Sequence, residues 1–332
     1  MKAVDYRALT TKITEADLAA YKKLTGDRWM TISETYMWVT VLAALAGLVT
    51  AIVGAILRMP GIVVQFGVVF GIGWAVVSAI LSAIVENTRA RVQLHKFAEM
   101  NHARYVFKQK DIPHTGMIFN KGHSRVIQHG ITFSDGIEVG EYRYTTGSGK
   151  SQQIHIWGFL MMKLPRRLPN MVLDTKKNNF LSVVTNLPDE FKNGQKLSLE
   201  GDFDKYFTLY APQEYARDAL YIFTPDVMQA AMDSEGAYDM EVVDDRFYIY
   251  AQTNYALVKE KNIKALMDIA KKVGGEIAEQ GSYYADERVG NREANVVAPL
   301  GQRLKTGTSI GVGIGMAVYI IYMIVRAISE IH

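Results

Sequence analysis

Three carboxylates alternate with other residues in one short segment of the chain. Glu200, Asp202 and Asp204 are spaced two residues apart, and in a β-strand this spacing places all three side chains on one face. Such a face can hold a divalent cation, because hard cations prefer oxygen ligands. The same spacing is typical of a solvated strand face with Phe203 and Phe207 turned toward the core. We favour the solvated face and keep the three carboxylates as the candidate metal ligands.

A second motif, Gly147-Ser148-Gly149-Lys150-Ser151, matches the end of a phosphate-binding loop. The complete pattern needs another glycine five residues before Gly149, where Tyr144 stands. It also needs a helix directly afterwards, so that backbone N–H groups meet the phosphate. Residues 152–157 alternate between polar and apolar types and predict a strand instead. We therefore interpret the motif as the turn of a β-hairpin.

The other polar residues form no recognised catalytic or metal-binding pattern. The chain has no cysteine, which excludes disulfides, thiolate nucleophiles and cysteine-ligated metals. None of the 7 histidines lies in a spacing typical of zinc sites, and no G-x-S-x-G nucleophile motif is present. We therefore expect no cofactor. The net charge of +3 is too small to indicate nucleic-acid binding.

Two pairs of basic residues are candidate contacts for lipid headgroups. Arg166 and Arg167 lie between prolines in a predicted loop, and Lys176 and Lys177 follow closely in the sequence. Near a bilayer, each such charge is attracted to anionic lipid by about 1 kcal/mol. The alternative, which we favour, is a solvated loop.

Three uncharged apolar segments predict that the chain is an integral membrane protein. They are Tyr36–Leu57, Gly61–Val85 and Ser309–Val325, and each has about the 20 residues that a helix needs to cross a bilayer. The first two are separated only by Arg58-Met59-Pro60 and therefore predict a helical hairpin rather than a signal peptide. Membrane lipid is thus an expected partner.

Small residues recur at four-residue spacing in these segments and indicate close helix packing. The glycines that carry the pattern are Gly47, Gly67, Gly71, Gly311 and Gly315. We favour packing of the three helices within one chain. Self-association into a homo-oligomer, or contact with other membrane proteins, is the alternative. A conducting pore is less well supported, because none of the segments contains an ionisable residue.

Lysine and arginine near the ends of the segments predict the orientation. Only Arg58 lies in the hairpin turn and only Arg326 follows the third segment, whereas the N-terminal segment carries Lys2, Arg7, Lys12, Lys22, Lys23 and Arg28. We therefore expect the chain in the cytoplasmic (inner) membrane, with the N-terminus and the large domain cytoplasmic and the C-terminus outside.

The predicted architecture combines three transmembrane α-helices with a soluble α+β domain that has a largely antiparallel sheet. We expect an N-terminal segment (1–35) with a short amphipathic helix at 14–25, a transmembrane hairpin (36–85), a helical stalk (86–110) running to about Phe107, the α+β domain (111–280), a tether (281–308) and the third helix (309–328).

Within the domain, local patterns predict individual elements. Thr224-Pro225-Asp226 is a strong helix start, because it combines an N-cap threonine, a proline at the first position and an acidic residue in the first turn. The other expected elements are a strand at Phe159–Leu164, a loop at Pro165–Asn170, a short strand at Met171–Leu173, a helix at Gln213–Ile222, a hairpin at Met240–Tyr250 turning at Asp244-Asp245-Arg246, and a helix at 263–273 ending near Gly274-Gly275.

Residues 197–251 carry a resemblance to a known group of proteins. The residues concerned are Gly201–Phe207, Tyr210, Phe223-Thr224-Pro225 and Phe247–Tyr250. The block resembles a bacterial family of uncharacterised membrane-anchored proteins, a domain of unknown function. The resemblance implies an N-terminal helical hairpin followed by a cytoplasmic α+β domain, and it implies no catalytic residue. The C-terminal apolar segment departs from the family pattern.

Three functions follow from these observations. The one that we favour is a membrane-anchored, non-enzymatic interaction or assembly protein with a cytoplasmic α+β module, a scaffold. The second is a transport or channel-like membrane component formed by oligomerised glycine-rich helices. The third is a membrane-surface, metal-dependent enzyme that uses Glu200, Asp202 and Asp204.

Overall fold

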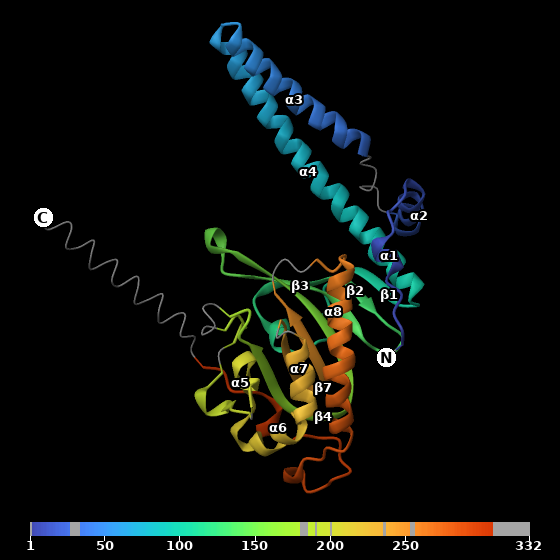
Figure 1. The fold of residues 1–332 in the computed structure, drawn as a ribbon, viewed down its shortest axis with the longest axis vertical. Coiled ribbons are helices and arrows are strands. Elements are labelled where there is room, and N and C mark those ends of the chain that lie inside the picture. The colour runs from blue at the N-terminus through green and yellow to red at the C-terminus, as the bar shows by residue number, and fades with distance from the viewer. Residues whose placement is uncertain are drawn as a thin grey trace, which may run out of the picture. The chain divides into compact units, whose positions relative to one another are not determined.

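A computed structural model gives the fold of this 332-residue chain. It describes residues 2–26, 34–179, 185–189, 191–199, 201–234, 237–252 and 256–307. The chain divides into two units, Asp5–Met100 and a larger one that combines Met1–Val4 with Asn101–His332. Figure 1 shows the elements of both units, which are described separately below.

The unit Asp5–Met100 consists of helices α1 (Arg7–Thr10), α2 (Glu15–Thr25), α3 (Glu34–Ile56) and α4 (Gly61–Met100). The predicted helix at 14–25 is confirmed as α2, and both of its ends are capped. Thr14 and Asp17 form a reciprocal capping box at its start, which satisfies two backbone N–H groups that would otherwise lack acceptors. Gly26 ends the helix in the left-handed conformation, with a φ of 68°.

Helices α3 and α4 form an antiparallel hairpin (Figure 1). By length and composition both are able to cross a membrane, with a mean hydropathy of 2.4 in the apolar 18-residue window of each. Their outward sides expose large apolar residues, among them Leu42, Ile52, Phe66, Val69 and Ile72. Contiguous apolar surface of this kind is rare on proteins surrounded by water. The predicted third helix, Ser309–Val325, lies entirely outside the described residues.

Three glycines lie where the backbones of α3 and α4 come closest. A Cβ atom added to Gly67 would be 2.7 Å from the Ala51 nitrogen, and one added to Gly47 would be 2.6 Å from the Gly71 nitrogen. Real Cβ atoms do not approach backbone atoms so closely, because the two would overlap. At these positions the small residues therefore allow α3 and α4 to pack closely within the hairpin.

The polar end of α4 carries helices α1 and α2. The Tyr21 ring of α2 packs edge-on against His95 of α4, with 5.0 Å between the ring centroids. Lys96 Nζ of α4 lies 2.8 Å from Asp17 Oδ1. Helix α4 ends at Met100 rather than near Phe107, so the C-terminal part of the expected stalk is wrong: residues 104–109 form a strand.

Within the described residues, the larger unit is built on one antiparallel sheet of seven strands. The strands are β1 (Arg104–Gln109), β2 (His123–Thr132), β3 (Glu138–Thr146), β4 (Gln153–Thr175), β5 (Lys196–Leu197), β6 (Phe207–Tyr210) and β7 (Asp239–Ala251). β1 to β4 follow one another as neighbours. β3 pairs with the first part of β4 and β6 with its last residues, whereas β7 pairs along the opposite edge of β4.

Strands β4 and β7 are both longer than the sequence predicts. The expected loop at Pro165–Asn170 and the expected turn at Asp244 are wrong, because both segments lie inside the strands. Their irregularities meet at the pair Leu168–Asp244, where the register shifts on both sides. Asp244 takes a left-handed φ of 55° there. A bulge accommodates the prolines of β4, because proline has no N–H group to donate to a regular β-ladder.

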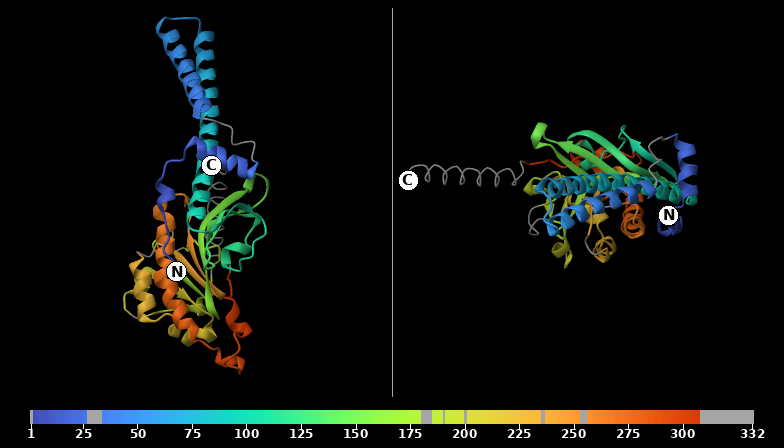
Figure 2. Two further views of the ribbon diagram at one scale, coloured as in Figure 1. Left: turned by 90° about the vertical axis from the view of Figure 1, so that its right-hand side faces the viewer. Right: turned by 90° about the horizontal axis from the view of Figure 1, so that it is seen from above.

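Helices cover one face of the sheet, as the view from above shows (Figure 2). They include α6 (Ala216–Ile222), α7 (Pro225–Asp233), α8 (Glu260–Ile269) and α9 (Gly275–Ser282). The predicted start of α7 is confirmed, because the Thr224 hydroxyl accepts a hydrogen bond from the Val227 N–H. The predicted helix end at Gly274 is wrong, since a π-helical turn at Ala270–Gly274 joins α8 to α9. A Cβ at Gly274 would lie 2.8 Å from Met162 Cε, so this glycine permits close packing on the sheet.

Loop segments cover the other face. The core there includes Phe119, Tyr142, Phe159, Tyr248 and Tyr250, all buried. Residues expected to form a free tether contribute to the domain instead: Val297 and Leu304 are buried, and Thr306 forms a β-bridge with Phe191. The described part of this unit also contains the short α-helices α5 (Phe203–Tyr206) and α10 (Pro299–Gln302).

Candidate functional site

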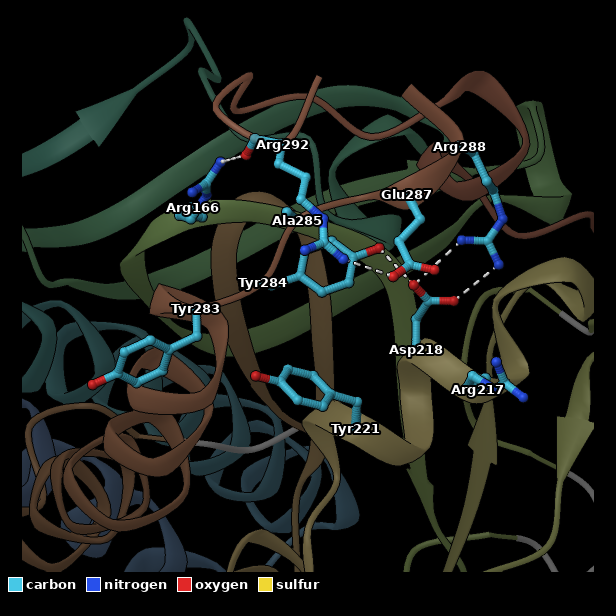
Figure 3. Close-up of a pocket in the computed structure, with 10 residues that line it drawn as sticks. All are labelled: Arg166, Arg217, Asp218, Tyr221, Tyr283, Tyr284, Ala285, Glu287, Arg288 and Arg292. Carbon is cyan, nitrogen blue, oxygen red and sulfur yellow. Dashed lines mark hydrogen bonds and ion pairs between the residues drawn. The ribbon is translucent and has the colours of Figure 1, made fainter. Parts of the chain in front are cut away.

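The larger unit contains an open pocket of about 790 Å³, a size typical of ligand sites. Helix α6, the segment that follows α9, and strand β4 provide its walls (Figure 3). The lining residues are Arg166, Arg217, Asp218, Tyr221, Tyr283, Tyr284, Ala285, Glu287, Arg288 and Arg292. The pocket is thus rich in arginine and tyrosine. We name it the Arg–Tyr pocket.

One wall of the pocket is fixed by Arg288. Its guanidinium donates to both carboxylate oxygens of Asp218, at 3.3 and 3.0 Å, and to Asp286 Oδ1 at 3.2 Å. It also lies over the Tyr215 ring, 3.9 Å from the centroid, where the ring quadrupole attracts a cation. Tyr284 donates to Asp218 Oδ1 at 2.9 Å. Figure 3 shows the Arg288–Asp218 pair at the edge of the pocket.

Asp286 holds this wall from behind. The Tyr215 hydroxyl donates to Asp286 Oδ2 at 2.6 Å, and the Ala298 N–H donates to the same oxygen at 2.8 Å. Although burial acts to raise it, these bonds and those from Arg288 hold the pKa of Asp286 below its usual value. Burial and the bond to Asp286 raise the pKa of Tyr215. Asp286 therefore stays an anion and Tyr215 a neutral donor at neutral pH.

The opposite side of the pocket is open, and three of its polar side chains make no hydrogen bond or ion pair within the described residues. Tyr283 is 77% exposed and Tyr221 is 46% exposed, and neither hydroxyl makes a hydrogen bond within the described residues (Figure 3). Arg217 makes no ion pair there either, within the same part of the chain. These three side chains present two aromatic faces and one positive charge at the surface.

The charges of the lining favour an anion. Four arginines face two acidic residues, Asp218 and Glu287, which leaves an excess of two positive charges. Arg166 is anchored by its guanidinium to the backbone carbonyls of Arg292, Glu293 and Ala294. The pocket can therefore bind an anionic group through arginine and pack a flat or apolar group on tyrosine.

The same geometry offers little for acid–base catalysis. A general acid or base works best with a pKa close to the working pH. The pKa of Tyr284 is raised by burial and by its bond to Asp218, and the pKa of Asp286 is lowered. Hydrogen bonds to Asp218 and Asp286 raise the pKa of Arg288, although burial opposes them. These shifts all lead away from neutrality.

The expected row of carboxylates is not formed as a strand. Asp202 precedes helix α5, and Asp204 lies within it, so period-two spacing does not apply to them. Asp202 pairs with Lys205 at 2.7 Å, and Asp204 accepts from the Leu199 N–H at 3.1 Å. Glu200 lies outside the described residues. Within the described residues, no three histidine, cysteine, aspartate or glutamate side chains gather to hold a metal ion.

The four basic residues proposed for lipid lie on β4 or directly after it and do not form one patch. Arg166 and Arg167 lie at the bulge, and Arg167 pairs with Asp244 at 2.7 Å. Lys176 follows the end of β4, and its ammonium donates to the Asp204 carbonyl. The Lys177 N–H bonds to the Thr175 hydroxyl. Lipid contact by these residues stays a prediction.

The other motifs have clear places in the structure. Gly47, Gly67 and Gly71 come together between α3 and α4, whereas Gly311 and Gly315 lie outside the described residues. The Gly147–Ser151 motif forms the turn between β3 and β4, as the sequence predicts, and a strand follows it. A phosphate-binding loop is thereby excluded, because it requires a helix at that point.

Sequence reasoning missed the Arg–Tyr pocket. Most of its residues come from 217–221 and 283–292, and the second segment reads as a polar tether. The local density of charge and tyrosine in Tyr283-Tyr284-Ala285-Asp286-Glu287-Arg288 was the available signal. This density indicates a pocket only when the fold places helix α6 beside the segment.

Comparisons with known proteins leave the family open. No protein-family description and no curated protein sequence matches this chain. The bacterial family that residues 197–251 resemble therefore stays an expectation. Among solved structures, the chain is similar to the mycobacterial trehalose monomycolate transport factor A, with a TM-score of 0.34 and 11% identity, over 54% of this chain and 93% of that one. A likeness at this level carries no conclusion about fold or function.

Proposed function

We propose that this chain is a membrane-anchored, non-enzymatic interaction protein. Helices α3 and α4 cross the cytoplasmic membrane as a hairpin, and the α+β domain and the N-terminus lie on the cytoplasmic side. The exposed apolar sides of the two helices and the excess of lysine and arginine before α3 support this arrangement. A third helix at Ser309–Val325 places the C-terminus outside.

The Arg–Tyr pocket is the binding surface of the domain. The observation that carries this proposal is the group of Arg217, Tyr221 and Tyr283, which is exposed beside a wall fixed by Arg288. Arginine and tyrosine are the residue types that contribute most to protein interfaces. The excess of positive charge selects a partner protein that presents an acidic segment.

Site-specific photocrosslinking in cells tests the proposal. The photoreactive residue p-benzoylphenylalanine is placed at position 283 of the full chain, and the matched control carries it at position 206. Tyr206 is also an exposed tyrosine, 47% exposed, but it lies on α5 and is not part of the pocket. We expect a defined crosslinked partner from position 283 only. Equal crosslinking from both positions, or none, would contradict the proposal.

A charge reversal gives a second, independent readout. Arg217→Glu changes the pocket, whereas Lys150→Glu makes the same change in the exposed β3–β4 turn. We expect Arg217→Glu to reduce recovery of the partner in affinity purification from mild detergent and Lys150→Glu to leave it unchanged. Purification of the unaltered chain only as a bare monomer would count against an interaction module.

A further inference from the structure

Two buried carboxylates lie directly opposite one another at the end of β4 and the start of β7. Leu173 pairs with Met240 in the β4–β7 ladder, so the next residues along, Asp174 and Asp239, are cross-strand neighbours on one face. Asp174 is 2% exposed and Asp239 is fully buried. Like charges in this arrangement repel one another, and burial removes the water that would screen them.

Asp239 accepts hydrogen bonds from three neighbouring residues. Its Oδ1 accepts from the Thr175 N–H at 2.9 Å. Its Oδ2 accepts from the side-chain amides of Asn178 at 2.9 Å and Asn186 at 3.0 Å. Because both amide NH₂ groups are turned to one carboxylate, both amide oxygens are turned away from it. Asp239 thus fixes the orientation of two neutral amide oxygen atoms.

These oxygens belong to a group of three buried acceptors without donors. By hydrogen-bond geometry, Asp174 Oδ1, Asn178 Oδ1 and Asn186 Oδ1 have no donor within the described residues, although the Thr185 hydroxyl lies near enough to Asp174 to stabilise its charged form. A chain of bonds links them: Asn179 donates to Asp174 Oδ2 at 3.4 Å and accepts from the Asn186 N–H at 3.1 Å. Buried polar atoms without partners are rare in native proteins, and each calls for an explanation.

We propose that this cluster is a calcium site, in which Asp174, Asn178 and Asn186 provide oxygen ligands and Asp239 orients the two asparagines. Calcium accepts carboxylate and amide oxygens together in flexible coordination. A ligand-orienting carboxylate of this kind is common around protein metal sites. A single water molecule has only two protons, so it cannot satisfy three acceptors.

Electrostatics around the cluster support a cation. No lysine, arginine or histidine forms an ion pair with either carboxylate in the described part of the chain. The Lys176 ammonium, whose charge acts on Asp174, donates to the Asp204 carbonyl.

Equilibrium dialysis of the full chain in mild detergent with radioactive calcium tests the site. After treatment with a chelator, we expect the chain to bind one calcium ion, and its midpoint of thermal unfolding to rise with calcium concentration. Asp239→Asn should weaken binding by about 10- to 100-fold, as loss of a ligand-orienting group does. Asp174→Asn should weaken it at least as much.

Asp202→Asn is the matched control, because it removes an exposed carboxylate that pairs with Lys205 outside the cluster. We expect calcium binding as in the unaltered chain. The proposal is overturned if the unaltered chain binds no calcium at millimolar concentration and shows no thermal shift, a result that does not depend on the folding of any variant. It is also overturned if Asp202→Asn loses as much binding as Asp174→Asn, or if Asp174→Asn binds normally.

Discussion

Replacing Gly67 by alanine should loosen the α3–α4 hairpin. The new Cβ would lie 2.7 Å from the Ala51 nitrogen and 2.9 Å from the Gly47 oxygen. Both are backbone atoms of a helix, so neither can turn aside as the end of a flexible side chain can. Ordinary contacts to carbon begin near 3.4 Å, and the two helices must therefore separate by about 0.7 Å at this point. A gap of that size forfeits roughly a quarter to a half of each local dispersion contact.

The expected cost follows from two opposing effects. Overpacking costs about 1–3 kcal/mol, whereas the change from glycine to alanine inside a helix gains about 0.5–1 kcal/mol. Gly67→Ala should therefore destabilise the hairpin by about 0.5–2 kcal/mol. Gly73→Ala is the matched control on the same helix, because a Cβ there meets nothing within 4 Å. It should stabilise the hairpin by about 0.5–1 kcal/mol.

Titration of the detergent-solubilised chain with sodium dodecyl sulfate measures the difference. Trp38 lies on α3 and Trp74 on α4, so tryptophan fluorescence, alongside helical circular dichroism, follows separation of the two helices. The order of stability should be Gly73→Ala, then the unaltered chain, then Gly67→Ala. Equal midpoints for the two variants would refute the close contact between the helices.

Three further changes test the sheet domain by thermal unfolding. Tyr250→Phe removes the hydroxyl that donates to the buried Glu241 at 2.6 Å and should cost about 1–3 kcal/mol; an unchanged midpoint would refute that bond. Burial raises the pKa of Glu141. The contribution of this carboxyl to the free energy of unfolding is therefore complete below its pKa in the unfolded chain, and it is lost as the pH rises through its pKa in the folded chain. Glu141→Gln should then match the unaltered chain near pH 4 and be the more stable of the two by about pH 8, and the absence of any pH dependence in this difference would contradict the assignment. Asp244→Asn removes the partly exposed pairs with Arg303 and Arg167 and should cost no more than about 1 kcal/mol for each pair, in low salt but not in high salt.

Elements whose signals lie within a few residues were predictable from the sequence. Helix α2 begins at a capping box and ends at Gly26, and α7 begins at Thr224-Pro225. The turn between β3 and β4 contains the glycines that such turns need. In each case the residues that decide the conformation contact one another along the chain, and no distant partner is required.

The length of β4 and β7 was not predictable in this way. Prolines at 165 and 169 and the acidic pair at Asp244 indicate breaks when each segment is considered alone. In the sheet, the two breaks face each other at Leu168 and Asp244 and form one shared bulge. Asn295 accepts the backbone N–H of Arg167 there, at 2.7 Å. Recognising this needs the pairing of segments that are 76 residues apart in sequence.

The candidate sites were hidden for the same reason. Asp286 and Arg288 read as part of a polar tether, because their partners Tyr215 and Asp218 lie on another element about 70 residues away. Asp174 and Asp239 become neighbours only through the β4–β7 register. The row of acidic residues at 200–204 attracted attention because it is visible in the sequence alone, yet the two described members lie at a short helix.

Strand β4 carries residues of both candidate sites. It pairs with three other strands and carries both Arg166, which anchors the loop beside the Arg–Tyr pocket, and Asp174, which belongs to the buried carboxylate pair. Eight residues separate the two positions, or about 26 Å along a regular strand. At that distance direct electrostatic coupling through water is largely screened. The pocket and the carboxylate pair are therefore separate sites on one rigid support, and a change in one should reach the other only through the order of the strand.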